Sequence, residues 1–183
     1  MSRPTDTERG ARLAYEIAHQ KEGVYVLEVI NGSGELMKEL DRRLRVMDQI
    51  IRLLFDATIG WLYPKSNPTA SERLSLIAVG GYGRGEMAPY SDVDIGFITP
   101  YKPTEWTEQV IGSMLYALWD LGLKVGHSSR SIDETMRMAK ADLTIRTALL
   151  EARFIWGDRG VYEECVARFD KEIMQGTARN FVA

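Results

Sequence analysis

The sequence has 183 residues, a length that suits one domain, and its 45% apolar and 27% charged residues are ordinary for a globular protein. The net charge of −3 gives no basic field for a nucleic acid, and the single cysteine, Cys165, excludes an internal disulfide and a cysteine-rich metal site. Residues 1–10 are polar and no stretch approaches the roughly 20 apolar residues that span a bilayer, so we expect a cytoplasmic protein with no membrane partner.

The first third of the chain is expected to be helical. Thr5–Glu8 has the pattern of a capping box, which predicts a first helix that runs to about Glu22. A second helix is predicted from apolar residues that recur every three or four positions and form one core-facing side: Leu36, Leu40, Leu44, Met47, Ile51 and Leu54. We therefore divide the chain into an N-terminal helical region, residues 1–68, and a core at residues 69–183 on which it packs.

Short strands and helices alternate after residue 69. The apolar pattern predicts strands at residues 75–79 and from residue 92 onward, and a third strand is expected near residues 123–130. Strands that are linked through helices indicate an α/β or α+β fold, in which helices pack against a sheet. Helices are predicted between Trp106 and Leu121, from Ser131, from Asp142 to Gly157, and from about Val161 to Met174.

Four glycines follow the first of these strands within six residues: Gly80, Gly81, Gly83 and Gly85. Since glycine has no Cβ, such a loop can turn sharply and bring its N–H groups close to an anion. The loop lacks the Gly-Lys-Ser/Thr ending of a P-loop, and its spacing differs from the dinucleotide-binding fingerprint. Taken alone, a glycine-rich run is most often only a loop.

Two acids, Asp92 and Asp94, open the next strand. Alternate strand residues share a face, so both carboxylates point the same way, about 7 Å apart at Cα. Such a pair can hold one or two hard divalent cations, although a lone Asp-x-Asp is usually a solvated strand face. Here Val93, Ile95 and Phe97 make the strand apolar, and two like charges on a buried strand are unfavourable without a cation. The glycine loop and the acids together suggest a nucleoside triphosphate with Mg²⁺.

This spacing resembles the signature of the nucleotidyltransferase superfamily, which includes DNA polymerase beta. The longer string at residues 79–94, Val-Gly-Gly-Tyr-Gly-Arg-Gly-Glu-Met-Ala-Pro-Tyr-Ser-Asp-Val-Asp, is similar to the bacterial protein-PII uridylyltransferase/uridylyl-removing enzymes. The similarity continues through residues 118–120, 123–130 and 141–153. It implies an α+β fold, with a small mixed β-sheet against which helices pack.

The resemblance also implies a reaction, the transfer of UMP from UTP to a tyrosine of the PII signalling protein with release of pyrophosphate, in nitrogen regulation. It assigns Asp92 and Asp94 as the catalytic acids that bind Mg²⁺ or Mn²⁺, and Gly80 and Gly81 as backbone donors to the phosphates. Members of this family are far longer and carry a phosphohydrolase domain and glutamine-sensing domains. We therefore expect this chain to be a fragment that neither removes uridylyl groups nor senses glutamine.

Four further residues are candidates for the site. Arg84 and Arg130 are expected to bind phosphate, with a solvent-facing loop charge as the alternative for Arg84. Ser91 is expected to contact a phosphate or to shape the turn before the acids. His127 has two open roles, as a general base or as a hydrogen-bonded structural histidine. Many superfamily members place a third carboxylate on a neighbouring strand, but residues 124–130 contain none.

Two other functions stay open at this point. An adenylyltransferase that modifies a protein carries the same motif, and a preference for ATP would identify it. A catalytically silent nucleotide-binding module would account for the missing third carboxylate, and it would bind nucleotide without metal and without turnover.

Overall fold

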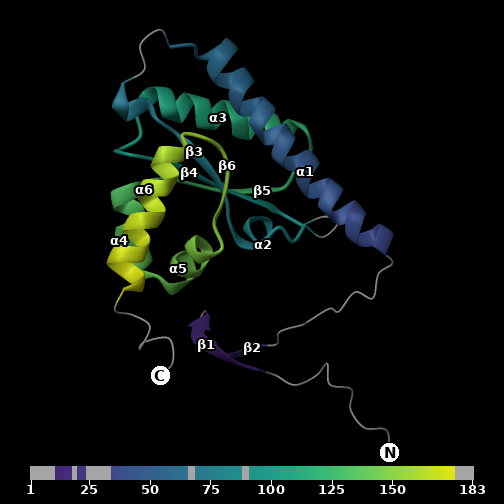
Figure 1. Ribbon diagram of the computed structural model, residues 1–183, viewed down its shortest axis with the longest axis vertical. Coiled ribbons are helices and arrows are strands. Elements are labelled where there is room, and N and C mark those ends of the chain that lie inside the picture. The colour runs from purple at the N-terminus through teal and green to yellow at the C-terminus, as the bar shows by residue number, and fades with distance from the viewer. Residues whose placement is uncertain (1–10, 18–19, 24–33, 66–68, 88–90, 176–183) are drawn as a thin grey trace, which may run out of the picture.

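The computed structural model describes residues 11–17, 20–23, 34–65, 69–87 and 91–175 (Figure 1). Its strands are β1 (Ala11–Ile17), β2 (Gln20–Gly23), β3 (Ser75–Ala78), β4 (Val93–Thr99), β5 (Val125–Ser131) and β6 (Arg153–Gly157). Its α-helices are α1 (Gly34–Ala57), α2 (Gly80–Gly83), α3 (Glu105–Asp120), α4 (Ile132–Ala141), α5 (Leu143–Leu150) and α6 (Arg159–Phe169). Short turns add η2 (Thr58–Leu62), η3 (Ala70–Glu72) and η4 (Asp170–Met174).

Four of the strands form one mixed sheet in the order β5-β4-β3-β6. β4 and β5 run parallel, whereas β3 is antiparallel to both β4 and β6. The parallel pair is joined by α3, as a parallel connection requires. The expected α+β fold with a small mixed sheet and packed helices is confirmed.

Helices cover both faces of this sheet (Figure 1). On one face, alternate β4 residues Val93, Ile95 and Phe97 pack with residues of α1 and α3 in one apolar cluster. On the other face, Ile77 of β3 and Ile98 of β4 pack with residues of α4, α6 and η4 in a second cluster. Burial on both faces explains why β4 is almost continuously apolar, and it makes the half-buried Asp94 within this strand conspicuous.

Local sequence signals account for most helix boundaries. The predicted helix between Leu36 and Leu54 is α1, and the helix between Trp106 and Leu121 is α3. α3 ends before Gly122, whose φ of 75° is the left-handed conformation that glycine adopts readily at a helix end. α5 begins at the predicted residue, because the Asp142 carboxylate accepts a hydrogen bond from the Thr144 amide at 2.7 Å. Among the described residues, no helix has both the length and the apolar character needed to cross a bilayer.

Two predictions about secondary structure were wrong. Residues 11–17 and 20–23 of the predicted first helix form the antiparallel strands β1 and β2, and the rest of that prediction lies outside the described residues. Leu13, Tyr15 and Ile17 alternate with other residues at the spacing of a strand, and this pattern outweighed the capping box upstream.

The helix predicted from Asp142 to Gly157 ends instead at Leu150, and residues 153–157 form β6. The sequence Arg-Phe-Ile-Trp-Gly is aromatic and β-branched, which suits a strand. Gly157 closes β6 with a φ of 88°, where any other residue would be strained.

Candidate active site

The glycine run folds into a single helical turn, α2, rather than an open loop. Gly80 has a φ of 59°, and the amides of Gly83 and Arg84 bond the carbonyls of Val79 and Gly80 at 3.0 and 3.1 Å. The first amides of a helical turn have no partner within the turn. The amides of Gly80 and Gly81 are therefore among those that have no partner within this turn.

Tyr82 anchors this turn to the rest of the protein. The tyrosine is 1% exposed, and its hydroxyl donates to Asp48 Oδ1 of α1 at 2.6 Å. Arg153 of β6 binds the same carboxylate through two hydrogen bonds, at 2.8 and 3.1 Å, and its guanidinium lies over the Tyr82 ring. Gly83 packs so closely that a Cβ there would lie 2.9 Å from the carbonyl oxygen of Ala78. The position of the glycine turn is thus fixed by two elements distant in sequence, α1 and β6, and by close packing against the end of β3.

Asp94 lies between two glycines that leave room for its carboxylate. In the parallel register of β4 and β5, Asp94 is paired with Gly126. A Cβ on Gly126 would overlap Asp94 Oδ1, and one on Gly80 would lie 3.2 Å from Asp94 Oδ2. The carboxylate therefore lies between the glycine turn and the edge strand β5. It fits there because Gly80 and Gly126 have no side chains.

A cavity of about 220 Å³ opens beside this carboxylate. Its wall combines Asp94 and Gly126 with Ser128 and Arg130 of β5, and with Thr144 of α5. Ser128 is paired with Gly96 and Arg130 with Ile98, so these residues follow Asp94 and Gly126 along the same face of the parallel pair. The cavity thus joins one half-buried carboxylate to one half-buried arginine. Within the described residues, Arg130 forms no ion pair.

Asp92 is exposed and directly precedes β4, two residues before Asp94. In the described part of the chain, no cluster of three or more acidic, histidine or cysteine side chains gathers around these acids. Two carboxylates supply the hard oxygen ligands that Mg²⁺ prefers, and Mg²⁺ commonly binds through one or two carboxylates plus substrate phosphates. The donor set and the space around Asp94 therefore fit a magnesium ion that nucleotide and water also coordinate.

Arg84 is held by two carboxylates at the end of the glycine turn. Its Nε bonds Glu86 at 2.8 Å, and its NH1 bonds Glu151 at 2.8 Å. Hydrogen bonds to Glu86 and then Glu151 raise the pKa of the Arg84 guanidinium. This geometry is compatible with both roles predicted for Arg84, phosphate binding and a solvent-facing loop charge. The side chain is partly exposed and lies beside Gly81. A phosphate at Arg84 would have to compete with the two carboxylates.

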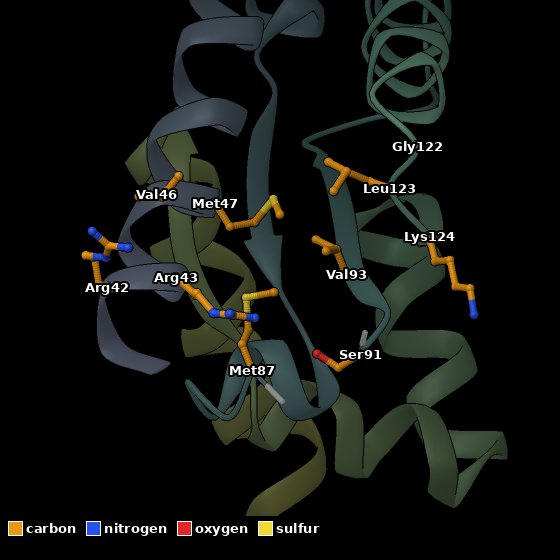
Figure 2. A pocket seen from close by; sticks show the side chains of 10 residues that line it. All are labelled: Arg42, Arg43, Val46, Met47, Met87, Ser91, Val93, Gly122, Leu123 and Lys124. Carbon is orange, nitrogen blue, oxygen red and sulfur yellow. The ribbon is translucent and has the colours of Figure 1, made fainter. Parts of the chain in front are cut away.

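The predicted site residues His127 and Ser91 differ in their relation to the Asp94 cavity, since His127 is among the residues that line it and Ser91 is not. Strand alternation puts His127 with Ile95 on the opposite face from Asp94, and its ring meets the Trp119 ring edge-on at 6.0 Å. Ser91 lines a different cavity, on the side of the sheet that α1 and α3 cover (Figure 2). The geometry therefore gives His127 an aromatic packing contact, and it separates Ser91 from the acids that follow it.

Sequence reasoning missed the residues that support the site. Gly126 had a signal, because glycine inside a strand often marks a close approach by another group. Asp48 had one too, since it falls on the core-facing side of α1 between Leu44 and Ile51, where a buried acid requires a partner. Its partners Tyr82 and Arg153 gave no comparable signal, because they meet Asp48 only in the folded chain.

Comparison with known proteins places this geometry in a family. Residues 65–153 match the family described as nucleotidyltransferase domain, which includes the glycine turn, both acids and β5. Residues 6–55 match the family described as ribosomal protein S6, a segment outside the candidate site.

The chain is 62% identical over 164 residues to a bifunctional uridylyltransferase/uridylyl-removing enzyme of Novosphingobium aromaticivorans, a match that covers 84% of this chain and 18% of that enzyme. Enzymes of the same name from Rhodopseudomonas palustris and Rhodospirillum rubrum are 58% and 56% identical over 78% and 75% of this chain, and 15% of each relative is covered. The chain thus spans less than a fifth of the length of these relatives. It belongs to the nucleotidyltransferases and, among them, to the family of the bifunctional uridylyltransferase/uridylyl-removing enzymes.

Proposed function

We propose that this chain transfers UMP from UTP to a tyrosine of the PII signalling protein, releasing pyrophosphate, in the cytoplasm. The observation that carries the proposal is the Asp94 carboxylate between Gly80 and Gly126, beside a cavity that also contains Arg130. Acid, backbone amides and arginine are the groups that bind a metal-bound triphosphate. The choice of uridylyl transfer follows the names of the relatives.

Each site residue has a proposed role. Asp92 and Asp94 hold Mg²⁺ or Mn²⁺, which neutralises phosphate charge when it is bound. The amides of Gly80 and Gly81 bind the phosphates, and Arg130 binds a terminal phosphate from the strand edge. Residues 69–183 form the catalytic core in this proposal, and α1 of the preceding region supports it through Asp48 and the contacts of that acid.

The chemistry is an in-line displacement at the α-phosphorus. The tyrosine oxygen forms a bond to this phosphorus while the bond to the oxygen that leads to the β-phosphate breaks. The products are uridylyl-tyrosine, pyrophosphate and one proton. The protein contributes by binding the triphosphate through groups in fixed positions. The attacking tyrosine oxygen and the leaving oxygen then lie on opposite sides of the α-phosphorus.

Isothermal titration calorimetry with UTP, ATP, CTP and GTP, each with and without Mg²⁺, tests the binding step. We expect Mg²⁺-dependent binding that prefers UTP, and its loss in Asp94→Asn, because the amide lacks the charge that holds the metal. Asp120→Asn is the matched control, since Asp120 is exposed at the end of α3 and lies outside the cavity. Circular dichroism should show both variants folded.

The other outcomes discriminate between functions. Preference for ATP would favour an adenylyltransferase. Nucleotide binding that is unaffected by both Mg²⁺ and the Asp94→Asn change would favour a silent binding module. An Asp94→Asn protein that still transfers UMP to the PII protein would disprove the assignment of the metal-binding acids.

A further inference from the structure

A second and larger cavity lies between α1, the segment before β4, and the turn that joins α3 to β5. Its volume is about 610 Å³, within the range of small-molecule sites. Figure 2 shows most of its labelled side chains around a common space, whereas Arg42 and Lys124 point away from it. Its wall is mainly apolar and includes Val46, Met47, Met87, Val93 and Leu123.

Two polar groups give this apolar space a specific chemistry. The Ser91 hydroxyl is buried and has no hydrogen-bond partner among the described residues, and Figure 2 shows it directed inward. Arg43 extends across the cavity toward Met87 in the same view, while its neighbour Arg42 points away. Glu39 binds both arginines through their Nε atoms at 3.0 Å, which leaves the terminal nitrogens of Arg43 for another acceptor.

This cavity is separate from the one beside Asp94. Ser91 and Val93 line it, and strand alternation turns them to the face opposite Asp92 and Asp94. Lys124 also belongs to its lining, but Figure 2 shows that side chain directed away from the common space, as is that of Arg42. The combination of apolar walls, a buried hydroxyl and the Arg43 guanidinium selects an apolar ligand that carries one anionic group.

We propose that this cavity is a binding site for a small organic anion with an apolar body. The apolar body fills the space between the methionines and Leu123, and its anionic group accepts hydrogen bonds from Ser91 and Arg43. Burial of the apolar body provides most of the affinity, and the two donors fix the orientation of the ligand.

Methyl NMR of the full chain tests this site directly. The sequence has eight methionines, and Met47 and Met87 line the cavity whereas Met114 and Met136 are buried in the two cores. We would label methionine methyl groups with ¹³C and titrate 2-naphthoate, with its neutral analogue 2-naphthalenemethanol in parallel. Saturable shifts of Met47 and Met87, with Met114 and Met136 unchanged, are expected for the acid, and binding of the alcohol should be roughly tenfold weaker.

Variants separate the site from general hydrophobic contact. Arg43→Met should weaken 2-naphthoate binding about tenfold, whereas Arg45→Met, an exposed arginine on the same helix that does not line the cavity, should leave it unchanged. Ser91→Ala should weaken binding without loss of stability, because its hydroxyl has no partner to lose. Absent or non-saturable shifts, equal affinity for acid and alcohol, or equal effects of the two arginine variants would overturn the proposal. The experiment contains no nucleotide, so its outcome is independent of the proposed transfer reaction.

Discussion

Tyr82 shows how one side chain fixes a backbone made otherwise of glycine. The residues on either side of it, Gly81 and Gly83, have no side chains with which to hold the turn. Its ring is buried, and its hydroxyl is bound to Asp48, which Arg153 holds in turn. A buried carboxylate shared by a tyrosine and an arginine is satisfied only when α1, α2 and β6 are all in place, so these residues couple the site to the fold.

Stability should depend on pH through this tyrosine. Burial and then the hydrogen bond to Asp48 raise the pKa of Tyr82 above its ordinary value. Unfolded tyrosine loses its proton near pH 10, whereas folded Tyr82 keeps it, so the stabilisation is present below about pH 10 and is lost as the pH rises further. Tyr82→Phe should lower the free energy of unfolding by about 1.5–3 kcal/mol at neutral pH. The difference in this free energy between the variant and wild type should become smaller above about pH 10.

Urea unfolding from about pH 7 to 11 measures both effects. Tyr116→Phe is the control, because Tyr116 is 68% exposed and should change neither the free energy of unfolding nor its pH dependence. A constant difference between Tyr82→Phe and wild type across this range would contradict the coupling of Tyr82 ionisation to unfolding.

At the scale of elements, the parallel register of β4 and β5 creates the candidate site. The register pairs Asp94 with Gly126 and places Arg130 four residues further along the same strand face. β4 thus supplies the acid Asp94. The edge strand β5 supplies Gly126, which leaves space for the carboxylate, and the cation Arg130. Neither strand forms the cavity alone.

Gly126→Ala should therefore weaken nucleotide binding while the sheet stays intact. The new Cβ would overlap the Asp94 carboxylate, which must rotate away from the glycine turn, and Mg²⁺-dependent UTP binding should weaken by at least about tenfold. Gly112→Ala on α3 is the matched control, since a Cβ there meets nothing within 4 Å. The Gly112→Ala control should bind UTP with Mg²⁺ as wild type does. Its free energy of unfolding should rise by up to about 1 kcal/mol, because alanine favours a helix. Calorimetry and urea unfolding provide the two readouts, and UTP binding by Gly126→Ala at the wild-type affinity would contradict this account of Asp94.

Sequence predicted the elements with strong periodicity and missed those that depend on distant partners. α1 and α3 carried regular apolar patterns or clear end signals, and their positions follow from local physics. β6 was assigned to a helix because its five residues are too few to show a period, and its strand conformation is stabilised by pairing with β3. The two acids were visible because they interrupt an apolar strand, whereas the contact between Asp94 and Gly126 depends on strand pairing that no local pattern encodes.

On the scale of the whole molecule, the sheet separates two cavities with different chemistry. The cavity beside Asp94 combines an acid with an arginine, and the larger cavity on the α1 side combines apolar walls with the Arg43 guanidinium and the Ser91 hydroxyl. The acids and the residues that line the larger cavity alternate within residues 91–94. One short segment thus faces both spaces, and a ligand in either of them would restrict the same start of β4.

Binding at the acids should stabilise the whole chain, since a ligand that binds only the folded state shifts the unfolding equilibrium. At a UTP concentration about 100 times the dissociation constant, the expected gain is about 2.7 kcal/mol. For a chain of this size that gain corresponds to a rise of roughly 5–10 °C in Tm. Differential scanning calorimetry should show the rise with Mg²⁺ and UTP together, and neither with UTP plus EDTA nor with Mg²⁺ and UTP in Asp94→Asn. A rise of equal size in EDTA would mean that the nucleotide binds without metal, which would remove the proposed role of Asp92 and Asp94 while leaving the fold and the family as they are.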